Sequence, residues 1–124
     1  MLVSSDNGTV ICSSLEEYRA ELRRCTDIQK SYEIWCSPDK EKYPCIGIIG
    51  GPNQAVIHYF SAEDGEMYVS MGDMERIGEI QFKTKSEVYE VAAYQILPLK
   101  LAMKCAEEFF MKVSLPACIE WEEL

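Results

Sequence analysis

The centre of the chain reads CIGIIGGPNQAVIHYF over residues 45–60. Two apolar runs, 45–49 and 54–60, lie on either side of Gly50-Gly51-Pro52-Asn53, whose glycines and proline favour a tight turn. Strands joined by so short a turn must be antiparallel, because a parallel pair needs a long crossover connection. The second run is apolar on both faces, which is typical of a central strand. The sequence therefore predicts an antiparallel sheet built around this hairpin.

Strand patterns continue on both sides of the hairpin. Residues 67–71 alternate between apolar and polar side chains and follow the turn Glu63-Asp64-Gly65-Glu66, so we expect a third strand that completes a meander. Two further alternating segments, 79–84 and 87–91, are separated only by Lys85-Ser86 and predict a second hairpin. Shorter strand patterns lie at residues 8–12, 31–36 and 117–121.

Two segments carry apolar side chains at helical spacing. Ser14 and Glu17 have the spacing of a capping box, which predicts the start of a helix over residues 15–26. Pro98 suits the first position of a second helix. The apolar stripe of that helix consists of Leu99, Ala102, Met103, Ala106, Phe109 and Phe110. We assign three residues near the C-terminus to the core: Phe109, Pro116 and Trp121.

These elements combine into one architecture. An amphipathic helix has to bury its apolar face against another element, and the sheet is the element available to it. The sequence therefore predicts an α+β fold. An antiparallel sheet, made of a meander plus a hairpin, carries an N-terminal and a C-terminal amphipathic helix packed on it. The length of the chain predicts a single domain over residues 1–124.

The chain is strongly acidic, with 21 acidic and 12 basic residues and a formal net charge of -9. A nucleic acid requires the opposite sign, so we expect no direct nucleic-acid binding. Binding to an anionic membrane surface is not expected either. The charge is consistent with solubility alone or with attraction to a basic protein partner.

The six cysteines sit mostly inside apolar patterns, which is typical of small core residues. Cys25 and Cys105 are predicted on helices, and Cys45 and Cys118 in strands. The first residues have neither the basic start nor the apolar run of a signal peptide, and no apolar stretch approaches the length of a membrane span. We therefore expect reduced thiols and a cytoplasmic location.

Few residues offer catalytic or metal-binding chemistry. His58 is the only histidine, and spacing assigns it neither a nucleophile nor an orienting carboxylate. No two cysteines form a C-x-x-C pair, so we predict no metal, no cofactor and no catalytic residue. Two alternatives to a binding protein stay open. One is a small enzyme of unrecognised type that uses His58, and the other is a structural module that self-associates through an exposed strand edge.

Carboxylates gather in the predicted turns and connections. Such loops are often only solvated, but an electronegative surface also speeds and orients association with a basic protein. Further acidic residues lie around the second predicted hairpin and near the C-terminal end, namely Glu79, Glu87, Glu90, Glu120, Glu122 and Glu123. We predict that six residues bind the partner: Glu63, Asp64, Glu66, Tyr68, Asp73 and Glu75.

Several motifs of the second half of the chain resemble those of one protein family. They are Ile80-Gln81-Phe82, Glu90-Val91, Ile96-Leu97-Pro98, Glu107-Glu108-Phe109-Phe110 and Leu115-Pro116-Ala117-Cys118-Ile119-Glu120-Trp121. With Ala55-Val56-Ile57-His58-Tyr59 and Gly72-Asp73, they resemble the immunity protein 1 family of bacterial polymorphic-toxin systems over residues 45–121. The chain differs from that family in residues 111–115, which lack the glycine that members commonly carry.

The resemblance implies a function. Members bind and neutralise toxin domains, often nucleic-acid deaminases, that are encoded beside them. The chain would then be a non-enzymatic protein of the bacterial cytoplasm, and its partner would be a cognate toxin with a basic surface. It would cover the active-site surface of that toxin, and it would be a monomer or a weak homodimer when free.

Overall fold

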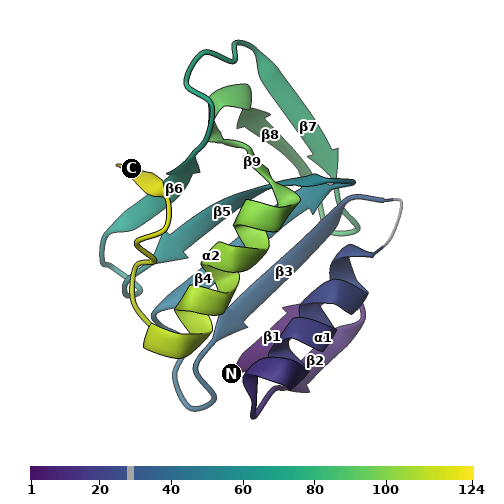
Figure 1. Cartoon of the computed structure of the whole chain (residues 1–124), viewed down its shortest axis with the longest axis vertical. Coiled ribbons are helices and arrows are strands. Elements are labelled where there is room, and N and C mark those ends of the chain that lie inside the picture. The colour runs from purple at the N-terminus through teal and green to yellow at the C-terminus, as the bar shows by residue number, and fades with distance from the viewer. Residues whose placement is uncertain (28–29) are drawn as a thin grey trace.

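Two helices lie on one face of an antiparallel sheet in the computed structural model, which describes residues 1–27 and 30–124 (Figure 1). The helices are α1 (Leu15–Thr26) and α2 (Leu99–Lys112). The main sheet has the order β10-β6-β5-β4-β3-β1-β2, and the short β9 pairs with β5. Its strands are β1 (Leu2–Ser5), β2 (Gly8–Ile11), β3 (Tyr32–Ser37), β4 (Cys45–Gly51), β5 (Gln54–Phe60), β6 (Met67–Met71), β9 (Leu97–Pro98) and β10 (Glu120–Glu123). The α+β prediction is confirmed.

The hairpin predicted at residues 45–60 forms β4 and β5, which lie inside the sheet. The register runs from Cys45 opposite Phe60 to Gly51 opposite Gln54. Asn53 takes a positive φ of 67°, which closes the turn. β6 pairs antiparallel with β5 and completes the predicted meander.

Both helices begin close to their predicted first residues. The amide of Glu17 donates to Oγ of Ser14 at 3.1 Å, as a capping box requires. The Glu17 carboxylate accepts from the amide of Ser13 at 2.9 Å, one residue before the expected donor. Pro98 is wrong as a first helical residue, because it is still extended and pairs with Gln54 as part of β9. The second helix therefore starts one residue later.

The main core lies between the helices and the sheet. Fully buried side chains from both layers meet there, among them Tyr18, Ile34, Ile57 and Phe109. The Tyr18 hydroxyl donates to the carbonyl oxygen of Ala106 at 2.9 Å. Because this bond joins α1 to α2 inside the core, it satisfies a polar group that burial would otherwise destabilise.

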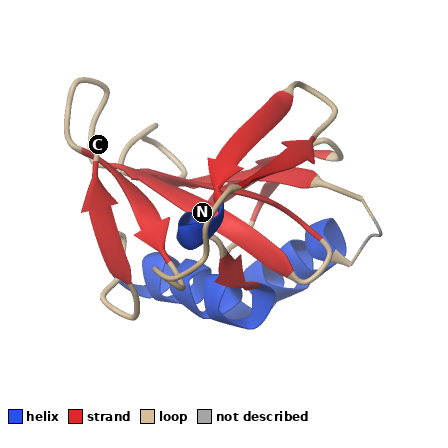
Figure 2. Cartoon of the chain, turned by 90° about the horizontal axis from the view of Figure 1, so that it is seen from above, coloured by secondary structure: helices blue, strands red, loops and turns tan. Residues whose placement is uncertain are grey.

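A smaller layer covers part of the opposite face of the sheet. β7 (Glu79–Lys83) and β8 (Val88–Ala92) form the predicted hairpin, which stands on the side away from the helices (Figure 2). Phe82 and Val91 of the hairpin pack there with Val56 of β5 in a second hydrophobic cluster. The hairpin pairs only with itself, so side-chain contacts hold it on the sheet.

The C-terminal segment departs from the predicted pattern. The last strand lies at Glu120–Glu123 rather than at 117–121. Trp121 Nε1 donates to the carbonyl oxygen of Pro116 at 2.7 Å, and the chain between these residues bends instead of extending. Pro116 is buried and Trp121 is half-buried against the main core, whereas Cys118 lies outside any strand.

The N-terminal pairing is a further difference. The sequence pattern predicts a strand at residues 8–12 only, but β1 precedes it and pairs with both β2 and β3. Val3 of β1 is fully buried, so this short strand contributes to the main core. Too few residues alternate in β1 for the pattern to indicate a strand.

The cysteines divide into two groups. Cys12, Cys25, Cys36 and Cys105 are buried, as expected of small core residues, whereas Cys45 and Cys118 are half-buried. Burial raises the pKa of the Cys36 thiol to about 12, so this group stays protonated at neutral pH. Across residues 1–27 and 30–124, no helix combines the length and the apolar composition that a membrane span requires.

Replacing Gly50 by alanine should lower the free energy of unfolding by about 2 kcal/mol, because the methyl group overpacks the turn. The new Cβ would lie 2.8 Å from Cβ of Ala55 and would meet the carbonyl oxygen of Gln54. Gly51→Ala is the matched control, since its Cβ would lie 3.5 Å from the Phe82 ring, an ordinary contact distance. Urea unfolding measures both variants, and equal stabilities would contradict the register of β4.

Candidate partner-binding surface

The five acidic residues predicted to bind the partner flank β6, the strand labelled in Figure 1, and the sixth predicted residue, Tyr68, lies within it. The turn with Glu63, Asp64 and Glu66 precedes the strand, and the connection with Asp73 and Glu75 follows it. A strand of this length spans roughly 16 Å, so the structure separates the two groups of carboxylates instead of bringing them together. All five acidic residues are exposed.

The turn between β5 and β6 is closed by its own backbone. The amide of Ser61 donates to the carbonyl oxygen of Glu66 at 3.0 Å, and the amide of Gly65 donates to that of Ala62 at 3.2 Å. The Tyr68 hydroxyl donates to Oε2 of Glu66 at 2.6 Å. This bond raises the pKa of Tyr68 to about 12, so the phenol stays neutral and holds the Glu66 carboxylate in one orientation.

The connection after β6, residues 72–78, is also internally bonded. Oδ1 of Asp73 accepts from the amide of Glu75 at 3.0 Å, which is the geometry of an Asx turn. The amide of Arg76 donates to the carbonyl oxygen of Asp73 at 3.1 Å. The carboxylate of Glu75 stays free to face solvent, whereas that of Asp73 has one oxygen bound to the backbone.

β10 connects the two groups of carboxylates. It pairs with β6 so that Glu120 lies opposite Met71 and Glu123 lies opposite Tyr68. Glu122, between them, accepts from the Tyr94 hydroxyl at 3.0 Å. We call residues 61–78 and 117–124 the acidic edge. The acidic edge contains eight carboxylate side chains and one basic residue, Arg76.

Apart from Arg76, the basic residues lie outside the acidic edge. A groove of about 780 Å³ between α1 and α2 is lined by four of them, namely Arg19, Arg23, Lys100 and Lys104. Only one acid, Glu107, lines the same groove, and it pairs with Arg19 at 2.6 Å. The net charge of -9 is therefore distributed unevenly, with the acidic edge at one border of the sheet and a basic groove on the helix layer.

His58 lies on the face of the sheet away from the helices. It is half-buried, and its ring stacks on Phe60 with centroids 6.4 Å apart. Burial lowers the pKa of its imidazole, which favours the neutral form. Within the described residues its side chain makes no hydrogen bond, and no cluster of three metal-ligating side chains is present in that part of the chain. No observation there favours the alternative of an enzyme that uses His58.

Trp35 occupies the neighbouring position on the same face. Its ring lies over Gly47, where an added Cβ would be only 2.6 Å from Cζ3 of the indole. Trp35 and Phe60 line a hollow of about 350 Å³ together with Tyr43 and Cys45. Part of this sheet face therefore stays uncovered beside the turn that begins the acidic edge.

Glu33 of β3 is half-buried and binds the turn of the β7–β8 hairpin, a role that the sequence pattern does not indicate. Its carboxylate accepts from Ser86 Oγ at 2.6 Å, from Thr84 Oγ1 at 3.2 Å and from Trp35 Nε1 at 2.8 Å. Partial burial raises the pKa of this carboxyl, but the hydrogen bonds, above all those from Ser86 and Trp35, outweigh burial and hold the pKa below its ordinary value. Glu33 thereby ties the β7–β8 hairpin to β3.

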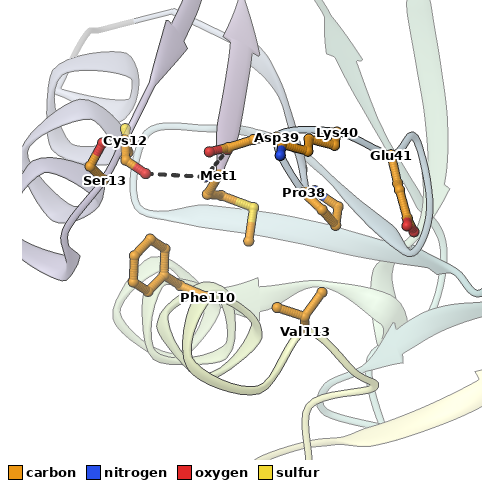
Figure 3. A pocket seen from close by; sticks show the side chains of 9 residues that line it. All are labelled: Met1, Cys12, Ser13, Pro38, Asp39, Lys40, Glu41, Phe110 and Val113. Carbon is orange, nitrogen blue, oxygen red and sulfur yellow. Dashed lines mark hydrogen bonds and ion pairs between the residues drawn. The ribbon is translucent and has the colours of Figure 1, made fainter.

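Another hollow, of about 520 Å³, lies beside the N-terminus (Figure 3). The ammonium group of Met1 donates to the carbonyl oxygen of Cys12 at 3.1 Å and pairs with Asp39. Figure 3 shows the Met1 side chain directed toward Phe110 and Val113 at the end of α2. The charges that line this hollow have both signs, so it offers no site for a strongly charged partner.

No family model fits the chain, and no curated protein is similar to it at a significant level.

Replacing Glu33 by glutamine should lower the free energy of unfolding by about 1–2 kcal/mol at pH 7, because an amide cannot accept all the donors that surround this position. The loss should shrink as the pH falls below 4.5, the ordinary pKa of the group, because the unfolded chain then binds the proton first. Urea unfolding at pH 7 and at about pH 3.5 measures this, with Glu63→Gln in the exposed turn as control. A loss of unfolding free energy that does not change with pH would contradict the lowered pKa of the Glu33 carboxyl.

Proposed function

We propose that the chain is an immunity protein that binds and neutralises a cognate bacterial toxin with a basic surface. The toxin attacks nucleic acid, and a deaminase is the activity that the family resemblance implies. The protein acts in the cytoplasm of the bacterium that makes the toxin. The observation that carries this proposal is the acidic edge, with its eight carboxylate side chains and one basic residue.

Charge explains how such an edge would recognise a toxin of this kind. An enzyme that acts on a nucleic acid has to attract a polyanion, so the mouth of its active site is positively charged. Carboxylates on the edge would occupy the positions that phosphates take in the substrate. Complementary charge would speed the encounter, and the protein would exclude the substrate by occupying the same surface.

The scaffold supports the same function, because it displays the carboxylates from fixed backbone. β6 is hydrogen-bonded to β5 on one side and to β10 on the other, so the two groups at its ends are held apart at a set distance. A surface that is ordered before binding loses little conformational entropy when the complex forms. The interface can therefore be tight even though most of its contacts are polar.

Self-association stays an alternative. The two edges of the sheet differ, since β10 carries three glutamates and β2 exposes the apolar side chains of Val10 and Ile11. Charged side chains oppose pairing of sheet edges between molecules. A homodimer would therefore form through β2, at the border of the sheet opposite the acidic edge, and would leave that edge free.

Reversing the charge of the β5–β6 turn in the triple variant Glu63→Lys, Asp64→Lys and Glu66→Lys should slow association with the toxin roughly tenfold to a hundredfold at low ionic strength. It should also flatten the dependence of the association rate on salt, because fewer charge pairs are left to screen. Stopped-flow or surface plasmon resonance measurements against the toxin domain encoded beside this gene would give both quantities.

The control for this experiment changes the net charge equally at another place. Asp6→Lys, Glu16→Lys and Asp27→Lys alter three exposed acids on the β1–β2 turn and on or next to α1. If the two triple variants slow association equally, net charge alone drives binding and the acidic edge is not the interface. If the wild-type chain does not bind the neighbouring toxin, the proposed function is wrong.

A further inference from the structure

The connection between β6 and β7, residues 72–78, exposes two large apolar side chains. Ile77 is 94% exposed and Met74 is 54% exposed. Single exposed apolar residues are common on protein surfaces and need no explanation. Two of them within four residues, on a segment that extends away from the sheet at the top of Figure 1, form a more specific feature.

Hydrogen bonds hold both ends of this connection in place. The amide of Gly72 donates to the carbonyl oxygen of Tyr94 at 2.6 Å, and the carbonyl oxygen of Gly78 accepts from the amide of Ala93 at 2.9 Å. Gly72 leaves no room for a side chain, because an added Cβ would meet the carbonyl oxygen of Ile96. Gly78 has a φ of +92°, a conformation that other residues rarely adopt. The connection is therefore fastened to residues 93–96 at both ends.

The middle of the connection is fixed as well. The backbone and side chain of Asp73 accept from Arg76 and Glu75, which makes a compact turn between Met74 and Ile77. The residues that carry most of the binding energy at protein interfaces fill well-packed pockets from which water is excluded, and two apolar side chains held on one ordered connection are suited to such a pocket. Little backbone entropy would be lost when a partner binds a connection that is already ordered.

We propose that Met74 and Ile77 enter an apolar pocket in the basic face of the toxin. The inference rests on the proposed function and names the contact that it would use. Around the two apolar side chains lie the exposed acids Asp73, Glu75 and Glu79, against the single cation Arg76. A partner that matches this pattern has an apolar pocket surrounded by positive charge.

An enzyme that acts on nucleobases has a pocket of that kind. It binds phosphates through basic side chains and holds the base between apolar and aromatic side chains. The connection presents the complementary pattern, with carboxylates around apolar groups. Met74 and Ile77 would fill the place of the base, and the surrounding acids would pair with the cations that hold the phosphates.

The test uses Ile77→Ser, Met74→Ser and the double variant, with the toxin domain encoded beside this gene as the binding partner. Each single variant should raise the dissociation rate about tenfold or more and leave the association rate nearly unchanged, because buried apolar contacts act mainly on dissociation. Ile77→Leu should retain most of the affinity. Because both side chains are exposed in the free chain, the midpoint of thermal unfolding should not change.

Two matched control variants replace an exposed apolar side chain by serine outside the connection. Ile11→Ser on β2 and Val88→Ser on β8 replace side chains that are 61% and 52% exposed, and they should not alter the dissociation rate. If the wild type binds the toxin and the Ile77 and Met74 variants dissociate no faster than these controls, the inference is overturned while the proposed function stands. If the wild-type chain does not bind the toxin, the proposed function itself is wrong.

Discussion

The pairing of β6 with β5 on one side and β10 on the other is the constraint on which the surface of this protein depends. β6 fixes the direction and separation of the two connections at its ends. β10 adds three glutamates between them and also protects the border of the sheet, since charged side chains oppose pairing with other strands. β10 is therefore both the edge strand of the sheet and a source of the negative charge at that border.

The second constraint is the attachment of the β7–β8 hairpin to the sheet. The hairpin forms no backbone pairing with the main sheet, so the small cluster around Phe82 and the hydrogen bonds of Glu33 hold it there. This attachment matters for the surface, because the chain leaves β8 through the 3₁₀ helix η1 (Ala93–Gln95). Tyr94 in that helix bonds to both Gly72 and Glu122, and so links the connection after β6 to β10.

Much of the fold could be predicted because its signals are local. The β4–β5 turn and the start of α1 at Ser14 each depend on residues within a few positions of one another. The bonds of Glu33 could not be predicted, since its partners on the hairpin lie more than 50 positions away in the sequence. Pro98 pairs with β5 through a contact that no local pattern indicates.

The candidate partner-binding surface also combines features that the sequence predicts with features that depend on contacts between distant segments. Acidic turns follow directly from composition, but only the register of β10 shows that its glutamates continue the same border of the sheet. The exposure of Ile77 is equally hidden in the sequence, where an apolar residue before a strand is expected to be buried. A pattern of charges can thus indicate what kind of surface is present, whereas its position and its apolar contacts depend on pairings between distant segments.

Hydrogen exchange of the chain, free and in complex with the cognate toxin that the proposed function requires, tests the central claim most directly. Amides in residues 61–66, 72–78 and 120–124 should exchange more slowly in the complex, because these segments form one continuous edge. Amides of α1 and α2, which lie on the helix layer and outside the acidic edge, should keep their exchange rates. Protection confined to the two helices, with none at either end of β6, would contradict the account.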